Sequence, residues 1–422
     1  MATSRRTLRY ALLGAAAFVA LIVLAFIILT RTDFGVERAG QFAVERLRSS
    51  VHGELRVGGV TSRGLLSGVT IHDVTIEDPE GRLFLAADSA RLAYRIRTLL
   101  GGDIAFDRLT LYTPTVNLER LPGQEEWNFE RIFPGDTTTV PDTLPDEDLV
   151  LIEDVTVMDG TVVLRLPWDP EPPVEPEDTA RLILEDVPGG VARVMRFEAV
   201  NGRMPRIVWD APGDDPKLFQ IAELSTRAYI WDTPADIRQL QGTMAWQDSV
   251  LLFETPSVRL PDSELSAVGE LVLGEEERFD IEARGDDVAF ADFQWLYPAL
   301  PDDGGGALTF RMQTQGDGRT LWLVQDARLR TGGTELAGSF GVITGDTLYF
   351  TNVSLRASPL DLELLEAVIP GDLPLEGLLI GTVEVEGPVS SLRTRGDVRF
   401  NRLAGIEGES AARWNGTVRA AP

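Results

Sequence analysis

Five stretches of the chain share one spacing of apolar residues. In each stretch, apolar side chains stand at relative positions 0, 2, 5 and 7, and a polar pair occupies positions 3 and 4. The apolar residues of the first three stretches are Val69, Ile71, Val74 and Ile76, then Ile104, Phe106, Leu109 and Leu111, then Val150, Ile152, Val155 and Val157. Those of the other two are Trp322, Val324, Ala327 and Leu329, then Leu348, Phe350, Val353 and Leu355. We call each stretch an octet.

The octet predicts a β-strand with a bulge in its middle. Side chains alternate between the two faces of a strand, so positions 0 and 2 lie on one face. The skipped step at the polar pair would turn positions 5 and 7 to the opposite face, unless a β-bulge absorbs one residue and restores the face. The polar pairs are His72-Asp73, Asp107-Arg108, Glu153-Asp154, Gln325-Asp326 and Thr351-Asn352. We therefore expect bulged, twisted strands that offer one continuous apolar surface.

Turn residues separate the strands of the first part of the chain. Strands are expected at residues 55–60, 69–77, 83–87, 90–94, 104–112 and 115–118, with glycines between several of them. Short strands at this spacing are typical of antiparallel all-β proteins rather than of βαβ units. The sequence predicts a mainly β fold, an elongated, antiparallel, repeat-built twisted sheet that is groove-like and follows an N-terminal transmembrane helix.

A longer repeat marks the second half. Residues 288–316 resemble residues 360–387, at an offset of roughly 70 residues. Each copy begins with a short helix-like segment, around residues 290–297 and 364–369, which Pro298 or Pro370 ends because proline cannot continue a helix. A glycine-marked turn and a strand follow, at residues 308–314 and 379–385.

The N-terminus carries an uncharged apolar run, residues 11–30, that is long enough to span a bilayer. Arg5, Arg6 and Arg9 precede it, so the positive-inside rule predicts a cytoplasmic N-terminus. A cleaved signal peptide is the alternative, but its apolar core is usually shorter, about 7–15 residues, and ends in small residues. The anchor residues are Ala11, Leu12, Phe18, Leu21, Ile22, Leu24, Phe26, Ile27 and Leu29. We expect a single-pass protein with the bulk of the chain across the membrane.

Four regions follow from these patterns. Residues 1–31 form the cytoplasmic tip and anchor, and residues 32–52 a juxtamembrane helix. Residues 53–285 form an N-terminal β-groove region, and residues 286–422 the repeat region. Two acidic, proline-rich loops at 134–148 and 167–178 lack the apolar content to pack. An octet lies between these loops, so they interrupt a sheet and do not separate domains.

Composition narrows the function classes. The chain holds 66 acidic and 39 basic residues, a net charge of −27. This charge argues against binding of nucleic acid and against lying flat on an anionic membrane. It has no cysteine, which excludes disulfides and thiolate chemistry. His52 and His72 are the only histidines, and no nucleophile elbow or phosphate-binding glycine loop is present. Solvated turns explain the acidic pairs at 286–287 and 302–303 better than calcium does. No catalytic residue, cofactor or metal is expected, and the protein is predicted not to be an enzyme.

Several segments point to one family: the anchor, residues 68–81 (GVTIHDVTIEDPEG), 99–102 (LLGG), 109–114 (LTLYTP) and the Trp127-Asn128-Phe129 triplet. Together they resemble the AsmA/TamB family of bacterial envelope proteins, in particular its N-terminal, TamB-like part. The repeats of the second half are also similar to those of the family. The resemblance implies an inner-membrane anchor, a periplasmic β-groove with an apolar interior, transport of phospholipid in outer-membrane biogenesis, and an outer-membrane partner of the barrel-assembly type.

Two arrangements of the octets and three functions of the protein remain open. Their apolar faces could be buried against each other in a sandwich, or could line an open groove that a lipid fills. With the resemblance, the sequence favours a periplasmic lipid-transfer protein whose octet residues, Ala327 excepted, contact phospholipid. The alternative is a scaffold or assembly factor for outer-membrane protein insertion, with no lipid conduit. The third is an anchored β-sandwich with an unrelated binding role.

Overall fold

The computed structural model describes residues 52–62, 69–94, 104–124, 126–132, 150–169, 179–210, 216–247, 250–272, 278–345, 347–362, 377–403 and 406–419. The predicted anchor, its flanking arginines, the helix at 32–51, the loop at 134–148 and most of the loop at 167–178 lie outside these residues. Within the described ranges, no helix has the length and apolar character needed to cross a membrane.

The structure is mainly β, and the described part of the chain holds 20 strands of one mixed sheet. The chain divides into two units. The N-terminal unit comprises Met1–Leu251 and Leu273–Glu276, and the C-terminal unit comprises Leu252–Val272 and Glu277–Pro422. The domain boundary expected at residue 285 lies within a strand of the C-terminal unit.

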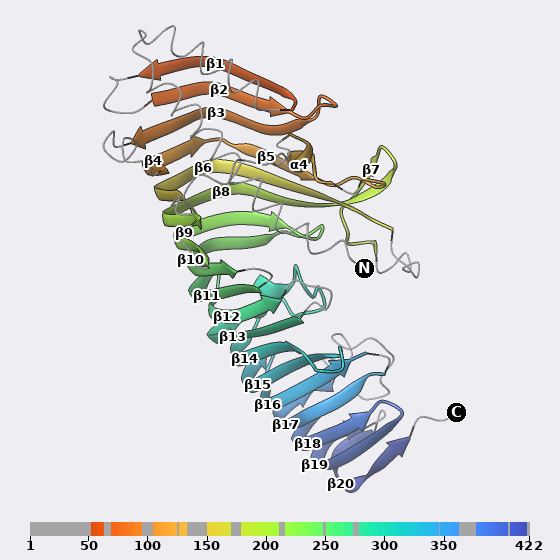
Figure 1. Cartoon of the computed structure of the whole chain (residues 1–422). Helices are drawn as coiled ribbons and strands as arrows, with labels where there is room; N and C mark the ends of the chain where they lie inside the picture. The colour runs from red at the N-terminus through yellow and green to blue at the C-terminus, as the bar shows by residue number, and fades with distance from the viewer. Residues whose placement is uncertain are drawn as a thin grey trace. The chain divides into compact units, whose positions relative to one another are not determined.

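The N-terminal unit contains ten strands and a short helix. The elements are β1 (Glu54–Ser62), β2 (Val69–Glu77), β3 (Leu83–Tyr94), β4 (Ile104–Tyr112), β5 (Thr115–Glu119), α4 (Asn128–Ile132), β6 (Val150–Pro167), β7 (Leu184–Val187), β8 (Gly190–Asp210), β9 (Lys217–Tyr229) and β10 (Ala235–Gln247). Figure 1 shows β1 to β4 side by side in chain order. The strands expected at 69–77 and 104–112 are confirmed, whereas those expected at 83–87 and 90–94 form the single strand β3.

The prediction of a purely antiparallel sheet was wrong at one place. Strands β4 and β5 both pair with β6 in parallel. Parallel neighbours need a connection of a dozen or more residues, and the chain from the end of β5 to β6 provides one that includes α4. Thr113 and Pro114 separate β4 from β5, and the Thr161 N–H of β6 donates to the Pro114 carbonyl at 2.7 Å. The sequence pattern marked the strands but not the direction in which these three would pair.

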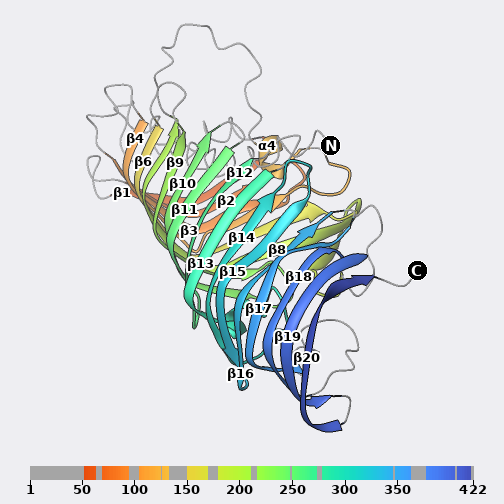
Figure 2. The same ribbon diagram turned by 90° about the horizontal axis from the view of Figure 1, so that it is seen from below.

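The C-terminal unit contains β11 (Val250–Arg259), which crosses the unit boundary, then β12 (Glu264–Val272), β13 (Arg278–Ala289), β14 (Gly305–Thr314), β15 (Thr320–Thr331), β16 (Thr334–Thr344), β17 (Tyr349–Asp361), β18 (Leu378–Pro388), β19 (Ser391–Leu403) and β20 (Ile406–Arg419). From β12 to β20 each strand pairs antiparallel with the next. Figure 2 shows β13 to β20 side by side and bent along their length. The helix expected at 290–297 is a 3-10 turn, Phe290–Phe293, followed by turns, and its repeat at 364–369 lies outside the described residues.

The predicted bulges are confirmed by register shifts in the octets of β4, β15 and β17, whereas the octets of β2 and β6 pair with their neighbours without a shift at the polar pair and show only the backbone angle of a bulge. Asp73, Asp154, Asp326 and Asn352, each the second residue of an octet's polar pair, have φ values of 50°, 49°, 52° and 53°. Asp and Asn adopt this left-handed region more readily than other residues with a side chain. The pairing of β15 with β16 shifts by one residue between Val324 and Ala327, so both side chains stay on one face. The remaining octet shows the same shift where β4 meets β3.

Candidate functional site

In the C-terminal unit, the bulges keep the octet side chains on one face of the sheet, which we call the octet face. Across neighbouring strands the register aligns Met312, Trp322, Val342 and Phe350 in one row. Phe310, Val324 and Phe340 form the next row. The rings of Phe310 and Trp322 lie 6.3 Å apart between centroids. The octet face is therefore continuous across at least four strands of this unit.

Solvent reaches this octet face. Trp322 is 41% exposed, Phe340 44% and Leu348 37%, values high for large apolar side chains. The other predicted lipid-contacting residues of this unit, Val324, Leu329, Phe350, Val353 and Leu355, are half-buried. Monomeric soluble proteins rarely expose extended apolar patches without a use for them. The octet face of the C-terminal unit is thus a candidate binding surface for an apolar ligand.

The opposite face of the same strands carries apolar residues, including the buried Leu323, near Trp322 and Val324, and charged residues beyond the bulge. Arg328, Arg330 and Arg356 alternate with octet residues along β15 and β17 and are exposed. Ion pairs join neighbouring strands on this face, with Arg330 to Glu335 at 3.1 Å and Arg393 to Glu386 at 3.2 Å. Exposed ion pairs contribute little stability, but they keep this side of the sheet hydrated. The sheet is therefore amphipathic along the part of β15 to β17 that carries these arginines.

In the N-terminal unit the octet face is covered. Six predicted lipid-contacting side chains are buried, and Val157 is half-buried; the six are Ile71, Val74, Ile76, Leu109, Leu111 and Val155. Val69, Ile104, Phe106, Val150 and Ile152 lie in β2, β4 and β6, and their side chains are outside the described part of the structure. Trp127, Phe129 and Ile132, from α4 and the residue before it, pack into the same core. We call these three residues the α4 plug, because they pack into the core that the octet residues of this unit help to form.

Asn128 fixes the α4 plug in place. Strand β5 pairs with β3 over only two residue pairs, which leaves later backbone groups of β5 without a strand partner on that side. The Asn128 amide bonds these groups: its Oδ1 accepts from the Glu119 N–H at 3.0 Å, and its Nδ2 donates to the Asn117 carbonyl at 2.8 Å. Asn128 is 1% exposed. Its position places the aromatic neighbours on either side against the core.

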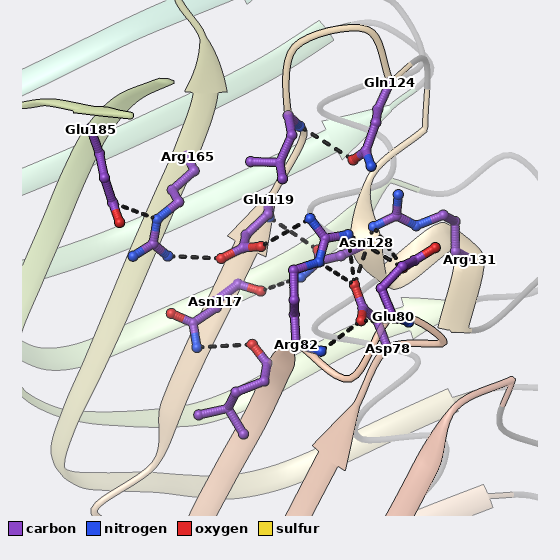
Figure 3. A network of polar contacts seen from close by, with 12 residues as sticks. Asp78, Glu80, Arg82, Asn117, Glu119, Gln124, Asn128, Arg131, Arg165 and Glu185 are labelled. Carbon is purple, nitrogen blue, oxygen red and sulfur yellow. Dashed lines mark hydrogen bonds and ion pairs between the residues drawn. The ribbon is translucent and has the colours of Figure 1, made fainter. Parts of the chain in front are cut away.

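A network of charges also binds α4 to the sheet (Figure 3). The buried Asp78 carboxylate accepts from the Arg82 backbone at 2.8 Å and from Arg82 Nε at 2.9 Å, and Arg131 of α4 donates to it at 3.3 Å. Burial by itself would raise the pKa of Asp78, but the hydrogen bonds and the charge of Arg82 outweigh burial and hold this pKa below its ordinary value. The carboxylate therefore stays ionised and holds Arg131 near neutral pH.

The sequence contained a signal for the α4 plug that spacing alone did not explain. The Trp127-Asn128-Phe129 triplet stood out only as part of a family resemblance, and its packing against the octets was not predicted. An amide between two aromatic residues, just after a strand, is a combination that can bond free strand backbone and bury both rings. Its role depends on where β5 leaves β3, which the local pattern does not specify.

The remaining polar candidates have structural positions. The His72 ring nitrogen Nε2 lies 2.9 Å from the Thr61 hydroxyl on the neighbouring strand. Asp286 and Asp287 lie where the pairing of β13 with β14 shifts register, and Asp302 bonds the Gln294 side chain in a turn. Among the residues that the structure describes, no group of three or more His, Asp or Glu side chains is arranged to hold a metal ion.

The chain was also compared with protein-family models, curated proteins and solved structures, and none of them matches it.

Proposed function

We propose that the protein is a membrane-anchored periplasmic lipid carrier, and that phospholipid moves along its octet face during outer-membrane biogenesis. One observation carries the proposal: an apolar sheet face whose large side chains, Trp322 and Phe340, stay more than a third exposed. The uncharged run at residues 11–30 supports the anchor, and the charged part of the opposite face supports a location in water for the rest of the chain.

The dimensions of an octet suit an acyl chain. An octet spans seven residue steps, which is about 23 Å along a strand at roughly 3.3 Å per step. One leaflet of a bilayer is about 15 Å of hydrocarbon, half of a core of roughly 30 Å. An acyl chain lying along a strand would therefore contact apolar side chains over its full length. Such contacts need no particular residue, only an uninterrupted apolar surface.

Site-specific photo-crosslinking in a Gram-negative host tests this function on the full chain. A photoreactive phenylalanine analogue is introduced at Phe340, on the octet face, or at Ala337, on the charged part of the opposite face of the same strand. Cells are labelled with radioactive phosphate before irradiation. We expect labelled phospholipid attached to the protein from position 340 and not from position 337. Equal labelling from both positions, or none from either, would refute lipid carriage on this face.

A second candidate function is a scaffold for outer-membrane proteins during their insertion, and strand β20 supports it. The described residues give β20 one antiparallel partner, β19, and its side chains from Gly408 to Arg419 are exposed apart from Ala412. An exposed strand edge can pair with another extended chain. The same crosslinking analogue at Trp414 of β20 distinguishes the two functions. Attachment to an outer-membrane protein would favour the scaffold, and attachment to lipid alone would favour the carrier.

A further inference from the structure

Two arginines of the N-terminal unit lie on its apolar side, with no charged partner among the residues that the structure describes. Arg193 of β8 pairs across the ladder with Leu166 of β6, and Leu166 packs against the buried core. Directly paired residues of neighbouring strands share a face of the sheet. Arg193 therefore lies on the same side as the core residues, in line with Leu166.

Arg120 occupies the matching position on the other side of Leu166. Its N–H donates to the Arg165 carbonyl at 3.0 Å, which extends the β5–β6 ladder by one residue beyond Glu119. Leu118 packs against the core, and the Glu119 side chain bonds Arg165 on the other side of the sheet. By alternation Arg120 returns to the apolar side. The backbones of Arg120 and Arg193 are then two strand spacings apart, about 10 Å.

Each of the two guanidinium groups lies over a tryptophan ring. Arg120 is 5.8 Å from the centroid of Trp127, and Arg193 is 5.1 Å from the centroid of Trp231. Arg181 also lies over Trp231, at 5.5 Å. Stacking on an aromatic face restricts the orientation of a guanidinium group and leaves its N–H edge free for other contacts.

Neither arginine is neutralised within the described residues. No ion pair to Arg120 or Arg193 is present there, and the Nε of each is buried without a hydrogen-bond acceptor. Burial lowers the pKa of Arg193 from its ordinary value. By contrast, Arg165 of the neighbouring strand bonds two carboxylates, at 2.8 and 2.9 Å. Within the described part of the chain, these two cations lack the carboxylate partners that a net charge of −27 could readily supply.

We propose that Arg120 and Arg193 form a phosphate-binding site that accepts a phosphate ester. Guanidinium groups match phosphate oxygens with paired hydrogen bonds, and an anion would supply the acceptors that both buried Nε atoms lack. Leu166 between them offers an apolar floor on which the ester's hydrocarbon can lie. The lipid form of this ligand, a phospholipid headgroup, rests on the proposed function. The free phosphate form does not.

The test compares the full chain with the double variant Arg120→Gln/Arg193→Gln and the control Arg196→Gln. Arg196 lies three residues along the same strand on the opposite face, where it pairs with Glu198 at 2.9 Å. Purified protein is incubated with vesicles of dioleoylphosphatidylglycerol or with dioleoylglycerol, and retained lipid is counted by native mass spectrometry. Binding of inorganic phosphate is followed separately by phosphorus NMR line broadening. Circular dichroism checks the fold of each variant.

We expect phosphatidylglycerol retention to fall about a hundredfold in the double variant, or about tenfold for each arginine, since each would provide charge-assisted hydrogen bonds. Dioleoylglycerol retention and the Arg196→Gln protein should be unchanged. Phosphate binding that the double variant loses, in a protein that retains no lipid, would support the site and refute lipid carriage. Equal loss of both lipids, or no loss of phosphatidylglycerol and phosphate binding, would overturn the site.

Discussion

Phe340→Asp places a charge on the octet face at a position that is already open to solvent. Phe340 lies on β16 opposite Val324, within the apolar row that includes Phe310. Because the side chain is 44% exposed, a carboxylate at this position can reach water in the ligand-free protein. The same carboxylate would be buried under a bound acyl chain. The substitution should therefore affect ligand binding more than folding.

The size of the effect follows from the exposed area. A phenylalanine side chain buries roughly 200 Å² when it is covered completely. The 44% that remains exposed is about 90 Å², which a ligand could cover for roughly 2 kcal/mol at about 25 cal/mol per Å². Losing this contact weakens retention about thirtyfold, and desolvation of the new carboxylate adds to the loss. The part already buried sets an upper limit of about 3 kcal/mol on lost folding stability.

The assay is lipid crosslinking from the photoreactive analogue at Val342, which lies on the octet face two residues from Phe340. Ala337→Asp is the matched control, because it adds the same charge to the same strand on the opposite face. There Ala337 lies between Arg328 and Arg356, which can pair with the new carboxylate. We expect Phe340→Asp to abolish crosslinking and Ala337→Asp to preserve it. If a folded Phe340→Asp protein crosslinks lipid like the control, lipid does not use this face.

Three further predictions concern stability, measured by urea unfolding with circular dichroism. Asn128→Ala should lose about 2–4 kcal/mol, because it leaves buried β5 backbone groups unpaired. Gln124→Ala, which removes one bond of 3.4 Å, should lose well under about 1 kcal/mol, and equal losses would contradict the role of Asn128. The pKa of Asp78 is lower in the folded protein than in the unfolded chain. The stability that the Asp78 carboxylate contributes is therefore present above the ordinary pKa of Asp, about 3.9, and is lost as pH falls through the folded-state pKa. Asp78→Asn should flatten this loss of stability in acid, and an unchanged pH profile of stability would refute the role of Asp78. Asn352→Val should lower the free energy of unfolding by about 1–2 kcal/mol, while Asn352→Gly leaves it unchanged, since only glycine accepts a φ of 53° freely. Equal stability of the two variants would count against a left-handed bulge.

The bulged strands could be predicted from the sequence because their cause is local. The octet spacing requires one extra residue, and Asp or Asn at the second position of four polar pairs suits the left-handed backbone found there. Whether the apolar face is buried or exposed could not be predicted in the same way. Leu109 and Val353 occupy equivalent places in their octets, yet Leu109 is buried under the core of the N-terminal unit and Val353 is half-buried. The difference lies in the core of the N-terminal unit, to which residues outside the octets also contribute, among them those of the α4 plug.

The proposed pair of arginines could not be predicted from the sequence either, because it depends on long-range strand pairing. In the sequence, Arg120 and Arg193 are two among many arginines, separated by more than seventy positions. Their alignment on either side of Leu166 depends on the parallel pairing of β5 with β6, which the spacing of turns did not predict. Alternation gives the face of a residue only after the strand partners and bulges are known. Charge compensation is likewise a property of the folded chain.

The same octet pattern has different consequences in the two units, and this difference limits where a lipid can bind. In the N-terminal unit, opening the octet face would require α4 to leave, which would expose Trp127, Phe129 and Ile132 and break the bonds of Asn128. Burial of these side chains is worth several kcal/mol, which a lipid bound there would have to offset before it gained any net binding energy. In the C-terminal unit, Trp322 and Phe340 are exposed already, so a ligand gains contact area without displacing protein. Binding of an acyl chain along an octet therefore belongs first to the C-terminal unit.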